Sequence, residues 1–149
     1  MTIPDDVDVY RVLPPSLIHK PPGAKLPTWE AFRPTDEDKK HKPIRVSVWD
    51  STKTTAREAV GLRRALATDP ARPFDAYAVC TGLVVAAGRR NGRADVQVVL
   101  DPAGLHQALV GQPGAAGHSG IEGLSQGAAA KPAWKTFLNE IAEACREVT

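Results

Sequence analysis

His118 and Glu122 have the clearest potential for acid–base chemistry in this chain. They lie in the segment GQPGAAGHSGIEGL, residues 111–124, in which glycine occurs at every third position. If this segment were helical, the two side chains would lie on one face, four residues apart. The carboxylate would then orient the imidazole and raise its basicity, as a general base requires. Gly120 and Gly123 oppose a helix, so the competing interpretation is a structural histidine in a flexible loop.

Arg11 and Asp50 complete the candidate catalytic set. Arg11 alternates with Val9 and Leu13 along a short expected strand, so it is either an edge residue that reaches solvent or a fixed cation at the lip of a cleft. Asp50 stands between an expected strand and a helix, where α/β proteins bind ligands and where ordinary capped turns also occur. A small transferase or hydrolase would bring four side chains into one cleft: Arg11, Asp50, His118 and Glu122.

The order of three positions resembles that of one class of ADP-ribosyltransferases. Those enzymes have an arginine on the first strand, a Ser-Thr-Ser strand and a later glutamate, and Arg11, Ser51-Thr52 and Glu122 follow that order. The resemblance implies a transferase site at these positions. The chain departs from the family pattern because Lys53 follows Thr52 and because no E-x-E or Q-x-E surrounds Glu122. The function of that family is therefore not carried over.

The other motifs that could carry chemistry are incomplete. The glycine-rich segment lacks the lysine of a phosphate-binding loop and does not place G-x-G-x-x-G after a strand. Ser119 lies in G-H-S-G, but Ile121 stands where a nucleophile elbow needs glycine. The histidines and cysteines show no metal-binding spacing, so we expect no metal and no cofactor. We expect Cys80 and Cys145 to be packed thiols, and sequence alone leaves a disulfide between them open.

Composition and charge are those of a globular protein. The chain has 149 residues, of which 42% are hydrophobic and 24% are charged, with a formal net charge of +2. This mild charge is not a nucleic-acid footprint. The N-terminal residues lack the basic and apolar regions of a secretory signal, and no apolar run approaches a membrane span. We therefore expect a cytoplasmic protein that does not enter membranes.

The elements that would position these residues give an α+β domain. Strands are expected at 7–13, 44–49, 74–85 and 95–100, and helices at 55–67 and 131–148. Asn91-Gly92 predicts a β-hairpin joined at 89–93. We expect one domain over 1–149, with a mixed or antiparallel sheet of about four strands and two main helices packed on it. A proline-rich irregular loop at 14–43 and a glycine-rich loop at 111–127 would connect these elements, and a parallel pair formed by the strands within 44–85 is an alternative.

Exposed basic and aromatic residues predict contacts with another protein. Arg89, Arg90 and Arg93 cluster at the expected hairpin tip, and Trp29 and Phe32 lie in the proline-rich loop. Nucleic acid is a second partner class, which we do not favour because no aromatic residues alternate with these arginines. In the absence of a complete catalytic motif, the leading hypothesis is a small accessory or protein-interaction protein without catalysis. The alternative is the transferase or hydrolase cleft described above.

Overall fold

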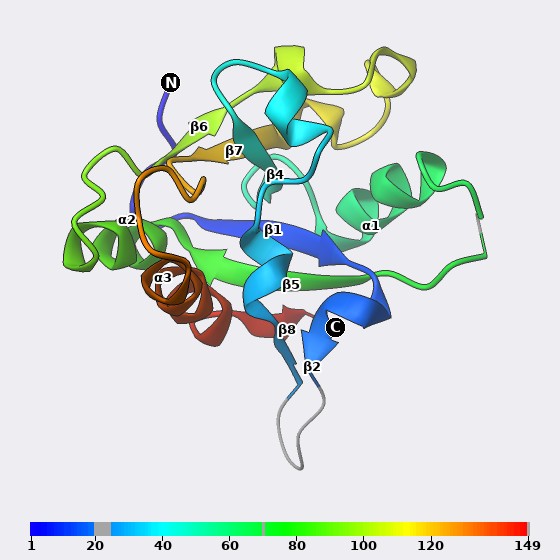
Figure 1. The fold of residues 1–149 in the computed structure, drawn as a ribbon. Helices are drawn as coiled ribbons and strands as arrows, with labels where there is room; N and C mark the ends of the chain where they lie inside the picture. The colour runs from blue at the N-terminus through cyan, green and yellow to red at the C-terminus, as the bar shows by residue number, and fades with distance from the viewer. Residues whose placement is uncertain (20–24, 70, 149) are drawn as a thin grey trace.

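The computed structural model describes residues 1–19, 25–69 and 71–148 (Figure 1). Its helices are α1 (Ala56–Ala65), α2 (Thr81–Arg90) and α3 (Lys131–Glu143). Its strands are β1 (Asp8–Leu13), β2 (Ile18–His19), β3 (Leu26–Pro27), β4 (Arg45–Asp50), β5 (Asp75–Cys80), β6 (Gln97–Leu100), β7 (His118–Glu122) and β8 (Arg146–Val148). Six single-turn 3₁₀ helices connect them: η1 (Pro15–Leu17), η2 (Trp29–Phe32), η3 (Asp38–Lys40), η4 (Pro102–Gly104), η5 (Gln107–Leu109) and η6 (Ala115–Gly117).

Six of the strands form one antiparallel sheet in the order β6-β7-β4-β1-β5-β8, and β2 pairs with β3 in a separate small sheet. The predicted α+β class is confirmed, whereas the expected number of about four strands and two main helices is too small. Strands β4 and β5 both pair with β1, so they run parallel to each other without being neighbours. None of the helices in the described ranges is long and apolar enough to cross a membrane.

The predicted hairpin at 89–93 is wrong, because the strand expected at 74–85 ends at Cys80 as β5, and α2 occupies residues 81–90. Asn91 and Gly92 end this helix instead of turning between two strands. The Asn91 backbone N–H donates to carbonyls of the last helical turn, and Gly92 has a φ of +70°. Left-handed glycine is favoured both at a helix C-terminus and in a tight hairpin turn, so the dipeptide predicted the backbone angle correctly and the element wrongly.

The predicted irregular loop at 111–127 is wrong for residues 118–122, which form β7 between β6 and β4. Gly120 has a packing role in this strand. A Cβ atom at Gly120 would lie 2.7 Å from the Cβ of Arg45, so the glycine gives the Arg45 side chain room to lie across β7. Glycine weakens strands in general, which is why the sequence pattern did not predict one here. The helix expected at 131–148 also ends earlier, at Glu143, and is followed by the edge strand β8.

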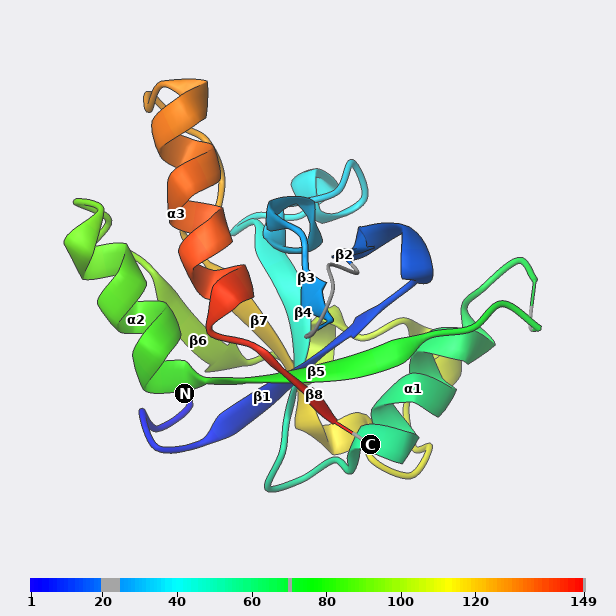
Figure 2. The same ribbon diagram turned by 90° about the horizontal axis from the view of Figure 1, so that it is seen from below.

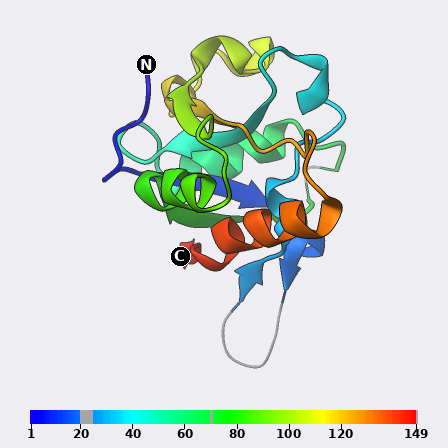
Figure 3. The same cartoon turned by 60° about the vertical axis from the view of Figure 1, so that its left-hand side comes forward.

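Apolar side chains pack on both faces of the large sheet. Alternation along β1 sends Val9 and Leu13 into the larger cluster and Val12 into a second one. The larger cluster includes residues of α2, α3 and η2, and the second includes residues of α1 and of 105–115. Figure 2 shows α1 on the side of the sheet opposite to α2 and α3, and Figure 3 brings α2 and α3 to the front. The sheet is therefore covered on both faces.

The N-terminal residues pair with the outer edge of β6. The Ile3 backbone N–H donates to the Val98 carbonyl over 2.8 Å, and the Leu100 N–H donates to the Met1 carbonyl over 3.0 Å. Thr2 and Val99 form an antiparallel bridge between these two bonds. The outer edge of this strand is therefore already hydrogen-bonded within the chain.

Tyr77 provides a test of core packing. It is fully buried, its hydroxyl is one of the buried polar groups without a partner in the described structure, and burial raises its pKa to about 12. We predict that Tyr77→Phe raises the free energy of unfolding by about 1 kcal/mol, because it removes a buried hydroxyl that forms no hydrogen bond. Urea denaturation measures this change. Tyr10→Phe, at a half-buried position of β1, is the control, and a larger loss of stability in Tyr77→Phe would contradict the prediction.

Candidate functional site

Ser47 brings together two of the four predicted catalytic residues. The Arg11 guanidinium donates from Nη1 to the Ser47 carbonyl over 3.0 Å. The Nε2 atom of His118 lies 3.3 Å from the Ser47 hydroxyl. Arg11 and His118 therefore both contact Ser47, Arg11 at the backbone carbonyl and His118 at the side-chain hydroxyl. Ser47 was not a candidate in the sequence, where it was only one polar position of an alternating strand.

Arg11 occupies the point at which β1 and β4 separate. Only Val9 and Tyr10 of β1 pair with β4, and Figure 2 shows the two strands diverging beyond these residues. Arg11 Nε donates to the Ala31 carbonyl over 2.9 Å, in addition to the bond to Ser47. Arg11 forms no ion pair with a carboxylate of the described ranges. Burial lowers its pKa to about 10, which leaves it charged at neutral pH.

The position of His118 on β7 fixes the tautomer of its neutral ring. The residue is 5% exposed, and its Nδ1 atom lies 2.7 Å from the Asp101 carbonyl oxygen. Because a carbonyl only accepts hydrogen bonds, Nδ1 must carry the proton, and Nε2 is left as an acceptor facing Ser47. Trp49, opposite His118 in the strand register, packs against the ring with 5.0 Å between centroids and 75° between the planes.

Glu122 does not pair with His118. The two residues lie four positions apart along an extended strand, so their Cα atoms are about 13 Å apart. Glu122 instead accepts from Arg45 Nε over 2.7 Å and from the Gln97 amide over 2.7 Å, and Arg45 also pairs with Asp101. Partial burial alone would raise the pKa of Glu122, but the hydrogen bonds from Gln97 and Arg45 outweigh it and lower the pKa. This ion-pair cluster joins β4, β7 and the residue after β6.

Asp50 has a local structural role at the end of β4. It is 4% exposed, and its Oδ1 atom accepts from the backbone N–H and the hydroxyl of Thr52 over 2.9 and 2.7 Å. These bonds fix the turn that leads into α1. Arg11 and His118 therefore share one neighbour, Ser47, whereas Asp50 and Glu122 have separate partners. The three positions that resemble the ADP-ribosyltransferase pattern form no common cluster of contacts within the described residues.

The basic residues predicted to contact a partner are mostly engaged within the chain. Arg90 forms a salt bridge with Glu140. Arg93 lies over the Phe137 ring and donates to carbonyls of the loop at 123–126. Of the three arginines predicted at a hairpin tip, Arg89 alone is exposed without a bond to another described residue. These residues therefore offer one free cation, not a basic patch.

The two aromatic residues of the proline-rich loop differ in exposure. Phe32 is fully buried in the core, so it is not available to a partner. Trp29 is half-buried, packs edge-on against Trp134 and has the cations of Arg33 and Lys135 near its ring faces. Phe32 and Trp29 therefore both pack the proline-rich loop against α3.

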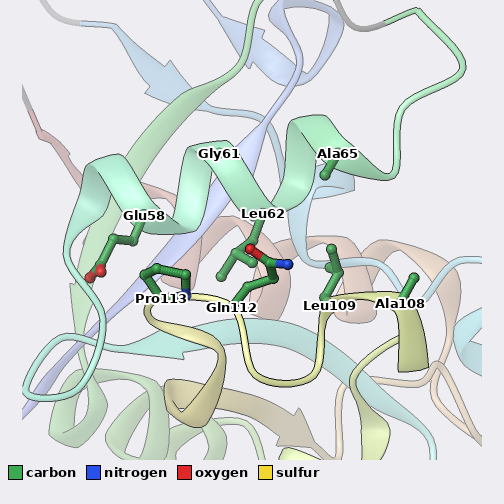
Figure 4. A pocket seen from close by; sticks show the side chains of 8 residues that line it. All are labelled: Glu58, Gly61, Leu62, Ala65, Ala108, Leu109, Gln112 and Pro113. Atoms are coloured by element: carbon green, nitrogen blue, oxygen red, sulfur yellow. The ribbon is translucent and has the colours of Figure 1, made fainter.

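Two grooves lie outside this cluster. The first, of about 540 Å³, lies between α1 and residues 108–113 and is apolar at its base (Figure 4). The second, of about 560 Å³, lies beside the proline-rich loop and is lined by charges of both signs, including Glu30, Arg33, Asp36 and Lys131. Neither groove is lined by a residue of the predicted catalytic set.

The two thiols are packed and unpaired. Cys80 and Cys145 form no disulfide, and burial raises the pKa of Cys145 to about 12. Across the described ranges, no three metal-ligating side chains lie close enough together to bind an ion.

No protein family model matches this chain, and comparisons with curated proteins and with solved structures found no similar protein. Function is therefore argued from the geometry of the site and the grooves.

Arg11 is predicted to be essential for the junction between β1, β4 and η2. Arg11→Lys keeps the charge but removes the forked pair of hydrogen bonds, because an ammonium group cannot reproduce the planar geometry of guanidinium. We expect a loss of about 1.5–3 kcal/mol in the free energy of unfolding, the range for one hydrogen bond to a charged group. Urea denaturation measures the loss, and Arg89→Lys on the surface is the control. Equal stabilities of the two variants would contradict the structural role of Arg11.

Glu122 is predicted to make the stability depend on acid pH. Its pKa is lower in the folded chain than the ordinary value of 4.5, so the unfolded chain binds the proton more tightly. Stability from this group is present above about pH 4.5 and is lost as the pH falls through the folded pKa. We therefore expect Glu122→Gln to be less stable than the wild type at neutral pH and the difference to shrink below pH 4.5. The midpoints of urea denaturation, measured at several pH values, give this difference, and Glu143→Gln is the surface control. A difference in stability between Glu122→Gln and the wild type that does not change with pH would refute the prediction.

Proposed function

We propose that this chain is a protein-interaction protein that binds a partner segment in the groove between α1 and residues 108–113. The feature that carries the proposal is Gly61, in the middle of α1. An ideal Cβ at this position would meet no atom within 4 Å. Glycine in a helix interior costs about 1 kcal/mol relative to alanine, and neither its backbone angles nor a close contact within the chain requires it here. The space beside Gly61 is therefore free for a group from another molecule.

The walls of this groove come from α1 and from the segment 108–113. Glu58, Gly61, Leu62 and Ala65 line it from α1 (Figure 4). Leu109 and Pro113 line the opposite side, and the buried Leu62 and Leu109 form its apolar base. Such an apolar base with polar groups at its ends suits the side chains of a short peptide segment.

One end of the groove is held closed by direct contacts. The Thr54 hydroxyl donates to the Gly114 carbonyl over 2.6 Å. A Cβ at Gly114, which has a φ of +83°, would lie 2.9 Å from the Cβ of Glu58. The turn at 112–115 is thereby fixed against the start of α1, so the groove is formed before a partner arrives. Preformed sites bind without the cost of ordering a loop.

The charges beside the groove favour an acidic partner. Arg57 and Arg64 lie on the same stripe of α1 as Gly61, are exposed, and form no ion pair with another described residue. Leu66 and Val110, next in the chain to lining residues, are 44% and 63% exposed. We therefore expect the partner to be a short segment with one or two apolar side chains flanked by aspartate or glutamate.

Substitutions at Gly61 separate binding from folding. Gly61→Ala and Gly61→Leu should raise the free energy of unfolding by about 0.5–1 kcal/mol, because they favour the helix and meet no neighbour. Gly61→Leu should nevertheless weaken partner binding by at least about tenfold, because its side chain fills the groove. Selection from a display library of short random peptides, followed by titration of the enriched sequences, measures binding. Thermal denaturation of the same proteins measures stability.

The matched controls place the same changes outside the groove. Ala133→Leu adds a leucine to an exposed position of α3, and it should leave peptide affinity unchanged. Arg64→Glu should weaken the binding of the selected acidic peptides, whereas Arg89→Glu, on α2, should leave their binding unchanged. Failure to enrich any peptide, or equal affinity of the wild type and Gly61→Leu, would refute the proposed docking site.

A further inference from the structure

The hydroxyl of Ser47 faces an imidazole nitrogen that accepts a proton. The Asp101 carbonyl fixes the proton of neutral His118 on Nδ1, and Nε2 points at Ser47 Oγ over 3.3 Å. The arrangement contains a hydroxyl, a base within reach of it and a third group that orients the base. A distance of this length is usual before substrate binds, since such bonds tighten in the reacting complex. In this site the orienting group is a backbone carbonyl.

Ser47 can be approached from outside, whereas His118 is shielded. Ser47 is half-buried and His118 is 5% exposed. Gly120 lies directly opposite Ser47 in the register of β4 and β7, and the Arg45 side chain occupies the space that a Cβ at Gly120 would fill, so access to the hydroxyl comes from the exposed part of Ser47 itself. The imidazole is held in place by Trp49 and by its bond to Asp101. A small substrate could therefore reach the hydroxyl while the base stays fixed.

A positive charge lies next to the same residue. The Arg11 guanidinium contacts the Ser47 carbonyl, and no carboxylate of the described chain forms an ion pair with it. Arg11 alternates with Val9 and Leu13 of the larger cluster, so its side chain lies on the opposite face of the sheet from the Ser47 hydroxyl and fixes only the backbone of Ser47. The hydroxyl of Ser119, by comparison, donates to the Gly117 carbonyl in a fully buried position, so that serine has neither a base nor access.

We propose that Ser47 is a nucleophile toward small carboxylic esters, with His118 as its general base. Ser47 Oγ attacks the ester carbonyl carbon and transfers its proton to His118 Nε2. The bond between the carbonyl carbon and the alkoxy oxygen then breaks, and the alcohol leaves with the proton from Nε2, so that Ser47 carries the acyl group. Water attacks the acyl group with His118 again accepting a proton, and the carboxylic acid is released. This activity does not involve the groove beside α1 and is independent of partner binding.

Acetylation by p-nitrophenyl acetate tests the proposal. The full chain is incubated with the ester, p-nitrophenol release is followed by absorbance, and the acetylated peptides are located by mass spectrometry. We expect an acetyl group on Ser47 of the folded wild type and none at that position in Ser47→Ala. Ser51→Ala, which removes a serine from the turn after β4, is the control. In this variant Ser47 should be acetylated at the wild-type rate.

His118→Asn separates a catalytic from a structural histidine. An asparagine amide can still donate to the Asp101 carbonyl from the position of Nδ1, but it has no equivalent of Nε2. We expect it to slow the acetylation of Ser47 by about a hundredfold or more, the usual effect of removing a general base. An unchanged rate, or a wild type without acetyl-Ser47, would overturn the proposal. Should the variant fail to fold, the wild type in urea replaces it: acetylation of Ser47 as fast as in the folded chain would equally overturn it.

Discussion

The separation of β1 from β4 is the constraint on which this fold depends. Two neighbouring strands that stop pairing leave backbone groups without partners in the middle of a sheet, and such groups are costly when buried. Arg11 satisfies two of the carbonyls at this point, one from β4 and one from η2, with hydrogen bonds from a charged donor. The proline-rich chain after β1 can therefore enter the larger core at Phe32, between sheet and α3, without breaking the sheet.

The candidate nucleophile and the docking groove lie on the side of the sheet that carries the second apolar cluster. Trp49 packs against the His118 ring and belongs to the same cluster as Leu62 and Leu109, which form the base of the groove. The two sites differ in what positions them. Strand register and a backbone carbonyl fix the Ser47–His118 pair, whereas the groove depends on how the turn at 112–115 packs against α1.

The sequence predicted those features that depend on local pattern. The alternation in β1 and β4 and the T-x-x-E capping box of α1 are local signals, and the structure contains all three. The strand at His118–Glu122 depends on a distant contact, since its glycine makes room for Arg45 from β4. Ser47 could not be singled out either, because its two partners lie 36 and 71 residues away and the bond to Arg11 uses a backbone carbonyl. Two of the predicted residues, Arg11 and His118, each contact Ser47. The other two, Asp50 and Glu122, have separate partners.

The pairing of residues 1–3 with β6 also affects how molecules of this protein can associate. An unpaired sheet edge is a template for a strand from another molecule, and in this sheet β6 would be such an edge. Met1 and Ile3 already use the hydrogen-bonding groups of Leu100 and Val98. A strand from another molecule would therefore have to displace residues 1–3 before it could pair with β6.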